Sequence, residues 1–288
     1  MPLDLAGKNV LITGPTSGLG WESAQRLRDR GAHIYMLARN VEKATPLRDQ
    51  LASSGGKATI IRCDTSMPES VTEASTQVKD LIERVDILIL NAGMAGRPPR
   101  KTTANGTELT FATNTMGHFQ LTHSLIPQLR GARVVWVCSL SASWGRINLD
   151  DLNLEKGWNL WAAYANSKAA NIALFQELAR RSDEAGWGIT SVGAHPGLSK
   201  TNAGSKDGKA PRTYKVLMDL GHVLKLTLTC AEGARPILYA ATADVQQGGY
   251  YGPKHALHGD PGPAKIVKAA MNPAINAALW EALEQRLV

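Results

Sequence analysis

The chain has 288 residues, of which 43% are hydrophobic and 20% charged, and these values are typical of a globular protein. This length supports a full hydrophobic core and excludes a small fold that depends on disulfide bonds or a structural metal. The net charge of +7 is compatible with an anionic ligand, but the basic residues are scattered and only 6% are aromatic, so we expect no nucleic-acid binding.

The chain starts with MPLDLAGKNVLITG, where a glycine and a lysine precede the first apolar run, so we expect no signal peptide. No segment reaches the ~18 apolar residues of a membrane span, so we expect no span either. The three cysteines are widely spaced and form no CxxC pair, which favours a reducing compartment. We therefore predict a cytoplasmic protein.

Short apolar, β-branched runs alternate along the chain with amphipathic stretches. The runs predict strands at 9–13, 32–38, 58–63, 86–90, 133–138 and 189–194. Amphipathic stretches such as 19–30 and 164–184 predict helices between them. This alternation favours parallel strands joined by right-handed crossovers, in a sheet that is covered on both faces. The sequence thus predicts an α/β fold, a Rossmann-like doubly wound parallel sheet in a single domain over residues 1–288.

A glycine-rich turn, TGPTSGLG, follows the first predicted strand and precedes a helix. Glycine allows the tight turn and the close approach of a pyrophosphate, whose charge the helix N-terminus stabilises. The glycine spacing is GxxxGxG, whereas the usual dinucleotide fingerprint is GxGxxG. We assign to a cofactor site the residues of this turn, Gly14, Thr16, Ser17, Gly18, Leu19 and Gly20. A purely structural turn is the alternative.

The end of the second predicted strand indicates which nicotinamide cofactor fits. An acidic residue there would hydrogen-bond the adenosine ribose, whereas an arginine accommodates a 2′-phosphate. The residues are Ala38, Arg39 and Asn40, so we expect NADP(H) rather than NAD(H). A solvated strand-end charge is the alternative for Arg39. Asp64 can accept from the adenine amine or cap the following turn, and we include both Asp64 and Thr65 in the cofactor site.

Tyr164 and Lys168 stand four residues apart in a predicted helix and therefore lie on one face. A neighbouring ammonium favours the phenolate form, so Lys168 would bring the Tyr164 phenol closer to useful acid–base chemistry. Such a pair on its own is more often structural than catalytic.

Six motifs, in this order along the chain, resemble those of the short-chain dehydrogenase/reductase family. They are the 13–20 turn, the turn Asn91, Ala92 and Gly93, then Asn114, Ser139, the pair Tyr164 and Lys168, and Pro196 and Gly197 with Thr201. The resemblance covers residues 8–201. It implies transfer of a hydride between a nicotinamide and a carbonyl carbon, without a metal.

The resemblance also implies roles for individual residues. Tyr164 would be the acid/base, Ser139 would hydrogen-bond the carbonyl oxygen, and Lys168 would bind the nicotinamide ribose and tune Tyr164. Asn114 would hold a water of the proton relay. The resemblance further assigns to the cofactor site Asn91, Ala92, Gly93, Tyr164, Lys168, Pro196, Gly197, Leu198 and Thr201.

Two serines, Ser139 and Ser141, compete for the catalytic position, and we choose Ser139 with Ser141 as the alternative. Cys138 departs from the Ser-Ser pair that is common in the family; it has no adjacent base, so we expect a small buried residue. The long segment before Tyr164, which includes Asp151, resembles the retinol dehydrogenase-like branch. Members of that branch often act on bulky apolar aldehydes or ketones.

Two segments after residue 199 interrupt the alternation of strands and helices. A polar loop at 200–210 leads into apolar residues at helical spacing, which predicts a substrate lid over about 200–226. Apolar residues at every fourth position predict a C-terminal helix over about 274–287. His118, His123 and His195 lack paired ligand spacing, so we assign them structural roles and expect no metal site.

We therefore expect an NADP(H)-dependent oxidoreductase that acts on a small-molecule carbonyl or alcohol substrate and reduces an apolar ketone or aldehyde. A non-catalytic NADP-sensing regulator is one alternative, disfavoured because the Asn, Ser, Tyr and Lys are all present. A nucleotide-sugar epimerase or dehydratase is the other, disfavoured because the region after Gly197 is short. The sequence leaves open the substrate, the physiological direction and whether the protein is a homo-oligomer.

Overall fold

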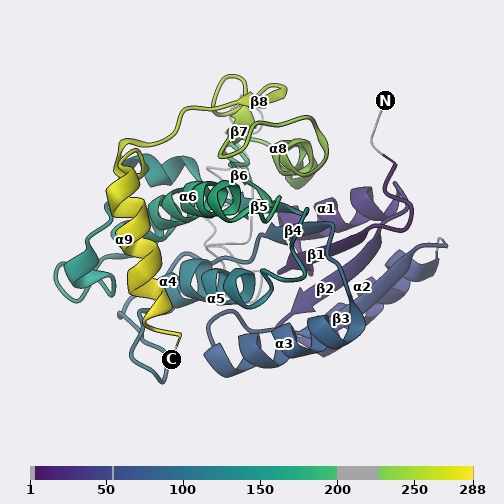
Figure 1. Cartoon of the computed structure of the whole chain (residues 1–288), viewed down its shortest axis with the longest axis horizontal. Coiled ribbons are helices and arrows are strands. Elements are labelled where there is room, and N and C mark those ends of the chain that lie inside the picture. Colours follow the sequence, from purple (N-terminus) through teal and green to yellow (C-terminus); the bar gives the residue numbers. More distant parts are fainter. Residues whose placement is uncertain (1–3, 54, 200–226, 288) are drawn as a thin grey trace.

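The computed structural model describes residues 4–53, 55–199 and 227–287, so the predicted lid at 200–226 and Thr201 lie outside the described residues. Within these ranges the chain forms one sheet in the order β3-β2-β1-β4-β5-β6-β7-β8, with helices on both sides (Figure 1). The strands are β1 (Asn9–Thr13), β2 (His33–Ala38), β3 (Lys57–Arg62), β4 (Ile87–Leu90), β5 (Arg133–Val137), β6 (Thr190–Ala194), β7 (Tyr250–Pro253) and β8 (Pro261–Pro263).

The α-helices are α1 (Gly18–Arg28), α2 (Val41–Ser53), α3 (Pro68–Leu81), α4 (Leu109–Phe111), α5 (Gly117–Ser124), α6 (Leu160–Ala185), α8 (Cys230–Thr242) and α9 (Pro273–Glu284). A π-helical turn, η1 (Ala112–Met116), joins α4 to α5. The short 3-10 turns are η2 (Leu140–Trp144), η3 (Leu149–Asp151) and η5 (Lys268–Ala270). No helix in the described part of the chain combines the length and the apolar composition that crossing a membrane requires.

The predicted doubly wound sheet is confirmed, with two differences. The six predicted strands are present with ends that differ by at most one residue, and their pairing is parallel. The sequence did not predict β7 and β8, and β8 pairs with β7 antiparallel. Only residues 254–260 connect these two strands. A parallel crossover needs a longer connection, usually a helix, so this short link dictates the antiparallel pairing.

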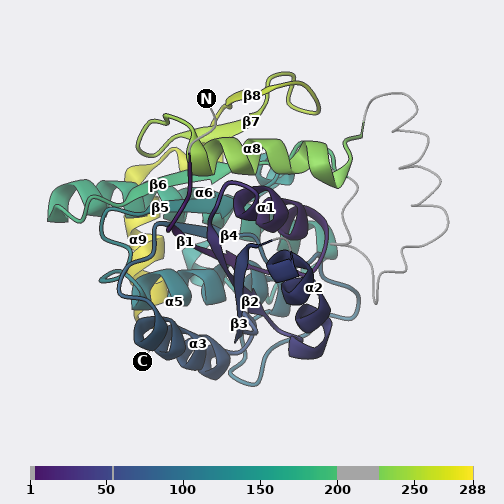
Figure 2. The same ribbon diagram turned by 90° about the vertical axis from the view of Figure 1, so that its right-hand side faces the viewer.

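Two hydrophobic layers cover the two faces of the sheet, because successive side chains of a strand point to opposite sides. Val10 and Ile12 of β1 pack in the layer formed by α1, α2 and α8. Leu11 between them packs in the layer formed by α3, α5, α6 and α9. All three side chains are fully buried, which explains why the strands are continuously apolar. Figure 2 shows α8 alongside α1 on the first of these faces.

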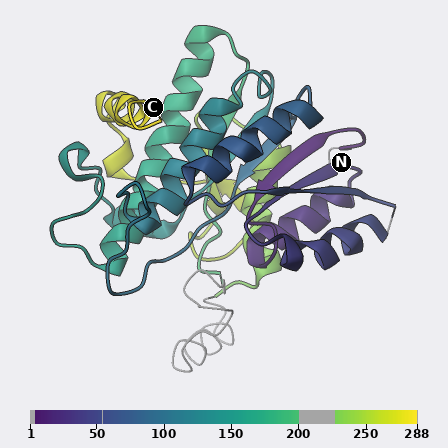
Figure 3. The ribbon, with the colours of Figure 1, turned by 90° about the horizontal axis from the view of Figure 1, so that it is seen from below.

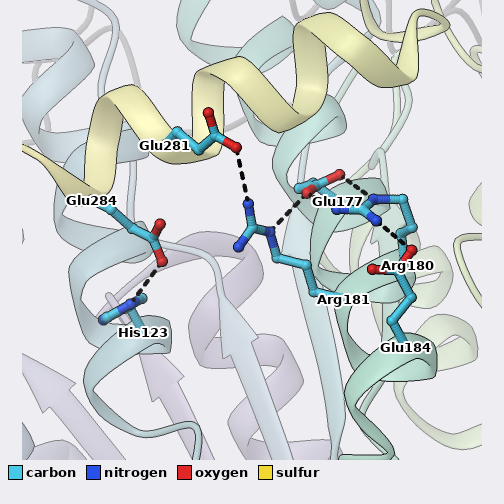
Figure 4. Close-up of polar contacts among 7 residues, drawn as sticks. All are labelled: His123, Glu177, Arg180, Arg181, Glu184, Glu281 and Glu284. Atoms are coloured by element: carbon cyan, nitrogen blue, oxygen red, sulfur yellow. Dashed lines mark hydrogen bonds and ion pairs between the residues drawn. The ribbon is translucent and has the colours of Figure 1, made fainter.

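The α9 helix packs crosswise against α6 (Figure 3). It begins one residue before the predicted C-terminal helix and ends three residues earlier, at Glu284. Its Trp280 is buried, and the guanidinium carbon of Arg181 lies 5.0 Å from the Trp280 ring centroid. Figure 4 shows polar contacts that join α9 to α6 and α5, between Arg181 and Glu281 (3.9 Å) and between His123 and Glu284 (3.1 Å). These contacts attach α9 to α5 and to α6, the helix that carries Tyr164 and Lys168.

Candidate active site

The glycine-rich turn connects β1 to α1 at the carboxyl edge of the sheet. Gly14 and Gly18 have φ angles of 64° and 55°, in the region that favours glycine. A Cβ at Gly20 would collide with the carbonyl oxygen of Gly14, so this position also requires glycine. In the described structure Ser17 does not cap α1 through its side chain, and the first turn has no acidic residue. The first amide groups of α1 are thus available to an anion, and the turn fits a pyrophosphate.

The turn after β4 is fastened to the glycine-rich turn by hydrogen bonds. The side-chain amide of Asn91 donates to the carbonyl oxygens of Thr13 (2.9 Å) and Gly14 (3.1 Å). The backbone amides of Asn91 and Ala92 both donate to the Thr13 hydroxyl oxygen at 2.9 Å. The two predicted cofactor motifs therefore form one rigid unit where the strand order reverses between β1 and β4, which is where α/β sheets bind dinucleotides.

The pair Tyr164 and Lys168 lies near the start of α6. Lys168 is only 3% exposed, and its ammonium donates a hydrogen bond of 2.8 Å to the carbonyl oxygen of Val137 at the end of β5. The ammonium nitrogen also lies 5.9 Å from the Tyr164 ring centroid and 3.5 Å from where a Cβ of Gly93 would be. Burial lowers the pKa of Lys168 to about 8. The structure thus brings together the helix pair and the Asn91–Gly93 turn.

Ser139 follows β5 and caps the short turn η2. Its hydroxyl oxygen accepts hydrogen bonds from the Ser141 amide (3.2 Å) and from the Ser141 hydroxyl (3.0 Å). At the end of η2, Gly145 lies so close to the Ala165 carbonyl oxygen that a Cβ there would collide with it. This contact holds the segment that carries Ser139 against α6 beside Tyr164. The two competing serines are therefore in contact, and Ser141 donates to Ser139.

Asn114 is fully buried in the π-helical turn η1. Its side-chain oxygen accepts from the Met94 amide (2.8 Å), and its side-chain nitrogen donates to the Met94 carbonyl (2.9 Å) and to the Ser167 hydroxyl (3.0 Å). Its backbone carbonyl oxygen accepts from Asn171 at 3.0 Å. Asn114 therefore ties the loop after Gly93 to α6, and its predicted water-binding role stays a prediction.

The predicted cofactor residues Arg39, Asp64 and Thr65 follow β2 and β3. Arg39 is exposed, and its side chain is 73% accessible with its Nε 3.9 Å from the Asp64 carboxylate. The other oxygen of that carboxylate accepts from the amide (3.0 Å) and hydroxyl (2.7 Å) of Ser66, so Asp64 does cap the following turn. The backbone of Thr65 packs tightly against Gly117 at the start of α5, where a Cβ would collide with the Thr65 carbonyl oxygen. The exposed Arg39 side chain at the carboxyl end of β2 is compatible with a phosphate ligand.

The loop after β6 contains Pro196, Gly197 and Leu198. Gly197 has a φ of 66°, and a Cβ there would lie 2.7 Å from the carbonyl oxygen of Leu257. The Pro196 carbonyl oxygen accepts a hydrogen bond of 2.6 Å from Ser199. The first turn of α8 lies beside the glycine-rich turn, since the sulfur of Cys230 is 3.9 Å from where a Cβ of Gly18 would be. This part of α8, which the sequence interpretation did not assign to the site, borders the cofactor region.

Two of the three histidines and Cys138 lie in the interior, and the third histidine contacts a carboxylate nearer the surface. His118 and His195 are buried, and burial lowers the pKa of His195 to about 4. His123 contacts Glu284. Burial raises the pKa of the Cys138 thiol to about 12, which makes it a poor nucleophile. Among the described residues, no three His, Cys, Asp or Glu side chains are grouped in a way that could hold a metal ion.

The sequence interpretation missed a buried carboxylate that holds the segment between Ser139 and Tyr164. Glu108 is 2% exposed and accepts hydrogen bonds from the Phe111 amide (2.8 Å) and from the Trp158 indole (3.3 Å). Arg100 donates to the Asn153 carbonyl oxygen at 3.0 Å in the same region. No local pattern marks Glu108, because its tryptophan partner is distant in sequence. These contacts fix the segment that resembles the retinol dehydrogenase-like branch.

The doubly wound sheet, the uncapped glycine-rich turn and the neighbouring Ser, Tyr and Lys define a dinucleotide-binding oxidoreductase. The family model described as short chain dehydrogenase matches residues 8–211. Human retinol dehydrogenase 13 is 34% identical over 249 residues, which are 83% of this chain and 73% of that protein. The chain belongs to the short-chain dehydrogenase/reductase family and to its retinol dehydrogenase-like branch, whose members act on CH–OH and C=O groups with a nicotinamide cofactor.

Two further comparisons extend over nearly the whole chain. A Streptomyces sp. (strain C5) protein assigned as daunorubicin C-13 ketoreductase DnrU is 31% identical over 283 residues, which are 96% of this chain and 92% of that protein. The crystal structure of an uncharacterized protein from Mycobacterium paratuberculosis superposes with a TM-score of 0.83 and 34% identity, over 99% of this chain and 95% of that one. The resemblance inferred from the motifs is therefore confirmed.

Proposed function

We propose that the protein transfers a hydride between NADP(H) and a carbonyl or alcohol substrate, with reduction of an apolar ketone or aldehyde as its forward reaction. The observation that carries this proposal is the position of the Lys168 ammonium between the Val137 carbonyl, the Gly93 turn and the Tyr164 ring. The positive charge of this ammonium stabilises negative charge on the Tyr164 oxygen. Its N–H groups can also donate a hydrogen bond to a ribose hydroxyl at the Gly93 turn.

In the direction of reduction, Tyr164 donates its phenolic proton to the substrate oxygen as negative charge develops on it. Ser139 donates a hydrogen bond to the same oxygen. The Ser139 oxygen already accepts from the amide and hydroxyl of Ser141, so its own proton remains for the substrate. The dinucleotide, when bound, supplies the hydride. In the direction of oxidation Tyr164 accepts the proton instead.

The preference for NADP(H) rests on Ala38 and Arg39. Neither position 38 nor position 39 carries a carboxylate, which would repel a 2′-phosphate. The exposed Arg39 guanidinium can bind such a phosphate. Asp64 lies 3.9 Å from Arg39, but it also accepts from Ser66, so Arg39 is not its sole partner. The Arg39 side chain can therefore turn toward a ligand without leaving a buried charge unpaired.

An apolar substrate is supported by exposed side chains on the segments that carry the site. Trp144 at the end of η2 is 79% exposed, Trp161 one turn before Tyr164 is 72% exposed, and Leu198 beside Gly197 is 42% exposed. Large apolar side chains at such exposure lose contact with water when an apolar ligand covers them. The names of the relatives, a retinol dehydrogenase and a daunorubicin ketoreductase, agree with a bulky substrate.

The test is a panel of retinal, aryl ketones, alkyl ketones and sugars, assayed with NADPH and with NADH through cofactor absorbance. We expect turnover with NADPH and the apolar members. In Tyr164→Phe, kcat should fall by about a hundredfold or more, because a general acid typically contributes that much. The dissociation constant for NADPH should stay within about twofold, since the phenol oxygen lies at the substrate. Unchanged turnover by Tyr164→Phe, or tighter binding of NADH than NADPH, would contradict the proposal.

A further inference from the structure

His118 is a buried titratable side chain at the site to which the proposed reaction gives no role. It lies on α5, four residues after Asn114, and is 0% exposed. Its ring is edge-on to Trp136, with 6.5 Å between the ring centroids. Both ring nitrogens have hydrogen-bond partners: Nδ1 is 3.1 Å from the Asn114 carbonyl oxygen, and Nε2 is 3.0 Å from the Thr13 hydroxyl oxygen. His118 therefore connects the Asn114 turn to the end of β1.

These partners determine which ring nitrogen carries the proton. A carbonyl oxygen can only accept, so Nδ1 must donate to Asn114. In the neutral ring Nε2 then has a lone pair, and the Thr13 hydroxyl donates its proton to it. The other acceptor near that hydroxyl, the Ile89 carbonyl oxygen, is 3.5 Å away and therefore weaker. The Thr13 proton is thus directed to His118.

The direction of this proton determines what the Thr13 oxygen can accept. With its proton on His118, the oxygen keeps both lone pairs for the amides of Asn91 and Ala92, which approach it at 2.9 Å each. A ring protonated on both nitrogens would direct a third N–H at the same oxygen and compete with these two amides for it. The Asn91 amide also donates to the Ile89 carbonyl oxygen at 3.1 Å, so the competition falls mainly on the Ala92 amide. The part of the fastening that the Thr13 hydroxyl provides therefore depends on a neutral His118, whereas the bonds from the Asn91 side chain to the carbonyl oxygens of Thr13 and Gly14 do not.

We propose that His118 is a positioning residue: as a neutral Nδ1–H imidazole it orients the Thr13 hydroxyl, which holds the Asn91–Gly93 turn against the glycine-rich turn and beside Lys168. This proposal rests on the proposed function, because the turn that it positions is part of the cofactor site. His118 touches neither substrate nor cofactor and acts through Thr13.

The electrostatic surroundings agree with a neutral ring. Burial first, and then the positive charge of Lys168, lower the pKa of His118 to about 3, against a smaller opposite effect of the Asn114 carbonyl. The ring therefore stays neutral over the pH range in which such enzymes work. The same ammonium that faces Tyr164 thus helps to keep His118 in the form that the Thr13 hydroxyl requires.

Two substitutions separate the two hydrogen bonds of the ring. In His118→Gln, the side-chain amide is separated from Cβ by the same number of bonds as Nε2 of the histidine, so its oxygen can still accept from the Thr13 hydroxyl. In His118→Asn, the shorter side-chain amide reaches only the position of Nδ1. We expect His118→Asn to weaken NADPH binding by about tenfold and His118→Gln by about threefold or less, because only the former leaves the Thr13 proton without its acceptor. His123→Gln, on the same helix, is the matched control and should leave the dissociation constant unchanged.

A double-variant cycle with Thr13→Val tests whether His118 acts through the hydroxyl. Once that hydroxyl is absent, His118→Asn should weaken NADPH binding no further. Equal losses in His118→Asn and His118→Gln, or additive losses with Thr13→Val, would overturn the proposal and leave His118 as a core residue that only fills space.

The tautomer can be measured without any cofactor. The ¹⁵N shifts of the His118 ring should show a protonated Nδ1 and an unprotonated Nε2 between about pH 6 and 8. A proton on Nε2 would overturn the proposed role of His118, whether or not the protein binds NADPH. The same variant cycle, measured by urea unfolding, should be non-additive as well. The ring shifts and the unfolding cycle can support the hydrogen bond from Thr13 to His118 even if wild type binds neither NADPH nor NADH. In that case the proposed function fails, while the arrangement of His118 and Thr13 stands.

Discussion

Replacing Lys168 with methionine should stabilise the fold at neutral pH while it abolishes the proposed activity. Burial lowers the pKa of this ammonium from 10.5 to about 8 in the folded protein. In the unfolded chain the group has its ordinary pKa, so at pH 7 folding moves a charge out of water. Each unit of pKa difference is worth about 1.4 kcal/mol, so the buried charge costs the folded state about 3 kcal/mol.

Lys168→Met removes this cost and keeps a long, flexible, apolar side chain in the same space. It also removes the 2.8 Å hydrogen bond to the Val137 carbonyl oxygen, which offsets about 1–2 kcal/mol of the gain. We therefore expect the free energy of unfolding at pH 7 to rise by about 1–2 kcal/mol in the variant. As the pH rises from about 8 to 10.5, the folded lysine loses its proton before the unfolded one does, so wild type gains stability and the difference shrinks.

Urea unfolding of both proteins at pH 7 and at about pH 10 measures this difference, and NADPH-linked turnover measures the activity. Lys79→Met on α3, where the side chain is exposed, is the control and should not change the pH dependence. A wild type more stable than Lys168→Met at pH 7, or a stability difference that stays constant with pH, would refute the reasoning that the ammonium is buried at a cost.

Three further sets of substitutions test the remaining parts of the site. Ser139→Ala should lower kcat by about a hundredfold and Ser141→Ala by less than about tenfold, because Ser141 acts only by donating to Ser139; the reverse order in steady-state assays would show that the wrong serine was chosen. Ala38→Asp combined with Arg39→Ser should raise the KM for NADPH by about tenfold or more and lower that for NADH, as measured by initial rates. Gly20→Ala pushes a Cβ into a backbone carbonyl oxygen of the same turn, so it should lower stability by about 1–3 kcal/mol and weaken cofactor binding, both measurable by melting with and without NADPH.

Most of the sheet could be predicted because each buried strand is a local signal. β4, with the sequence ILIL, is apolar at every position and lies between two amphipathic stretches, so its strand character and its burial follow together. β7 and β8 have the sequences YYGP and PGP, and because glycine and proline are uncommon inside strands, these segments do not have the pattern that predicts a strand. Their pairing arises from contacts with β6 and with each other, and no single-strand pattern records it.

The site could be predicted only as far as its motifs are local. Tyr164 and Lys168 are four residues apart in one helix, so their shared face follows from helical geometry. The hydrogen bond between Thr13 and His118 joins residues that are 105 apart in sequence, and nothing near either residue points to the other. Asp64 shows an intermediate case: the sequence left two roles open, and its contact with Ser66 is the capping one.

The attachment of α9 has a consequence for the order in which the molecule can be completed during synthesis. This helix follows the other described helices in the chain, yet its Trp280 packs edge-on against Phe119 of α5 with 4.9 Å between the ring centroids. Until α9 has left the ribosome, the Phe119 ring and the adjoining flank of α6 lack their cover. A chain whose α9 has not yet docked therefore exposes an apolar surface to which chaperones and other nascent chains can bind.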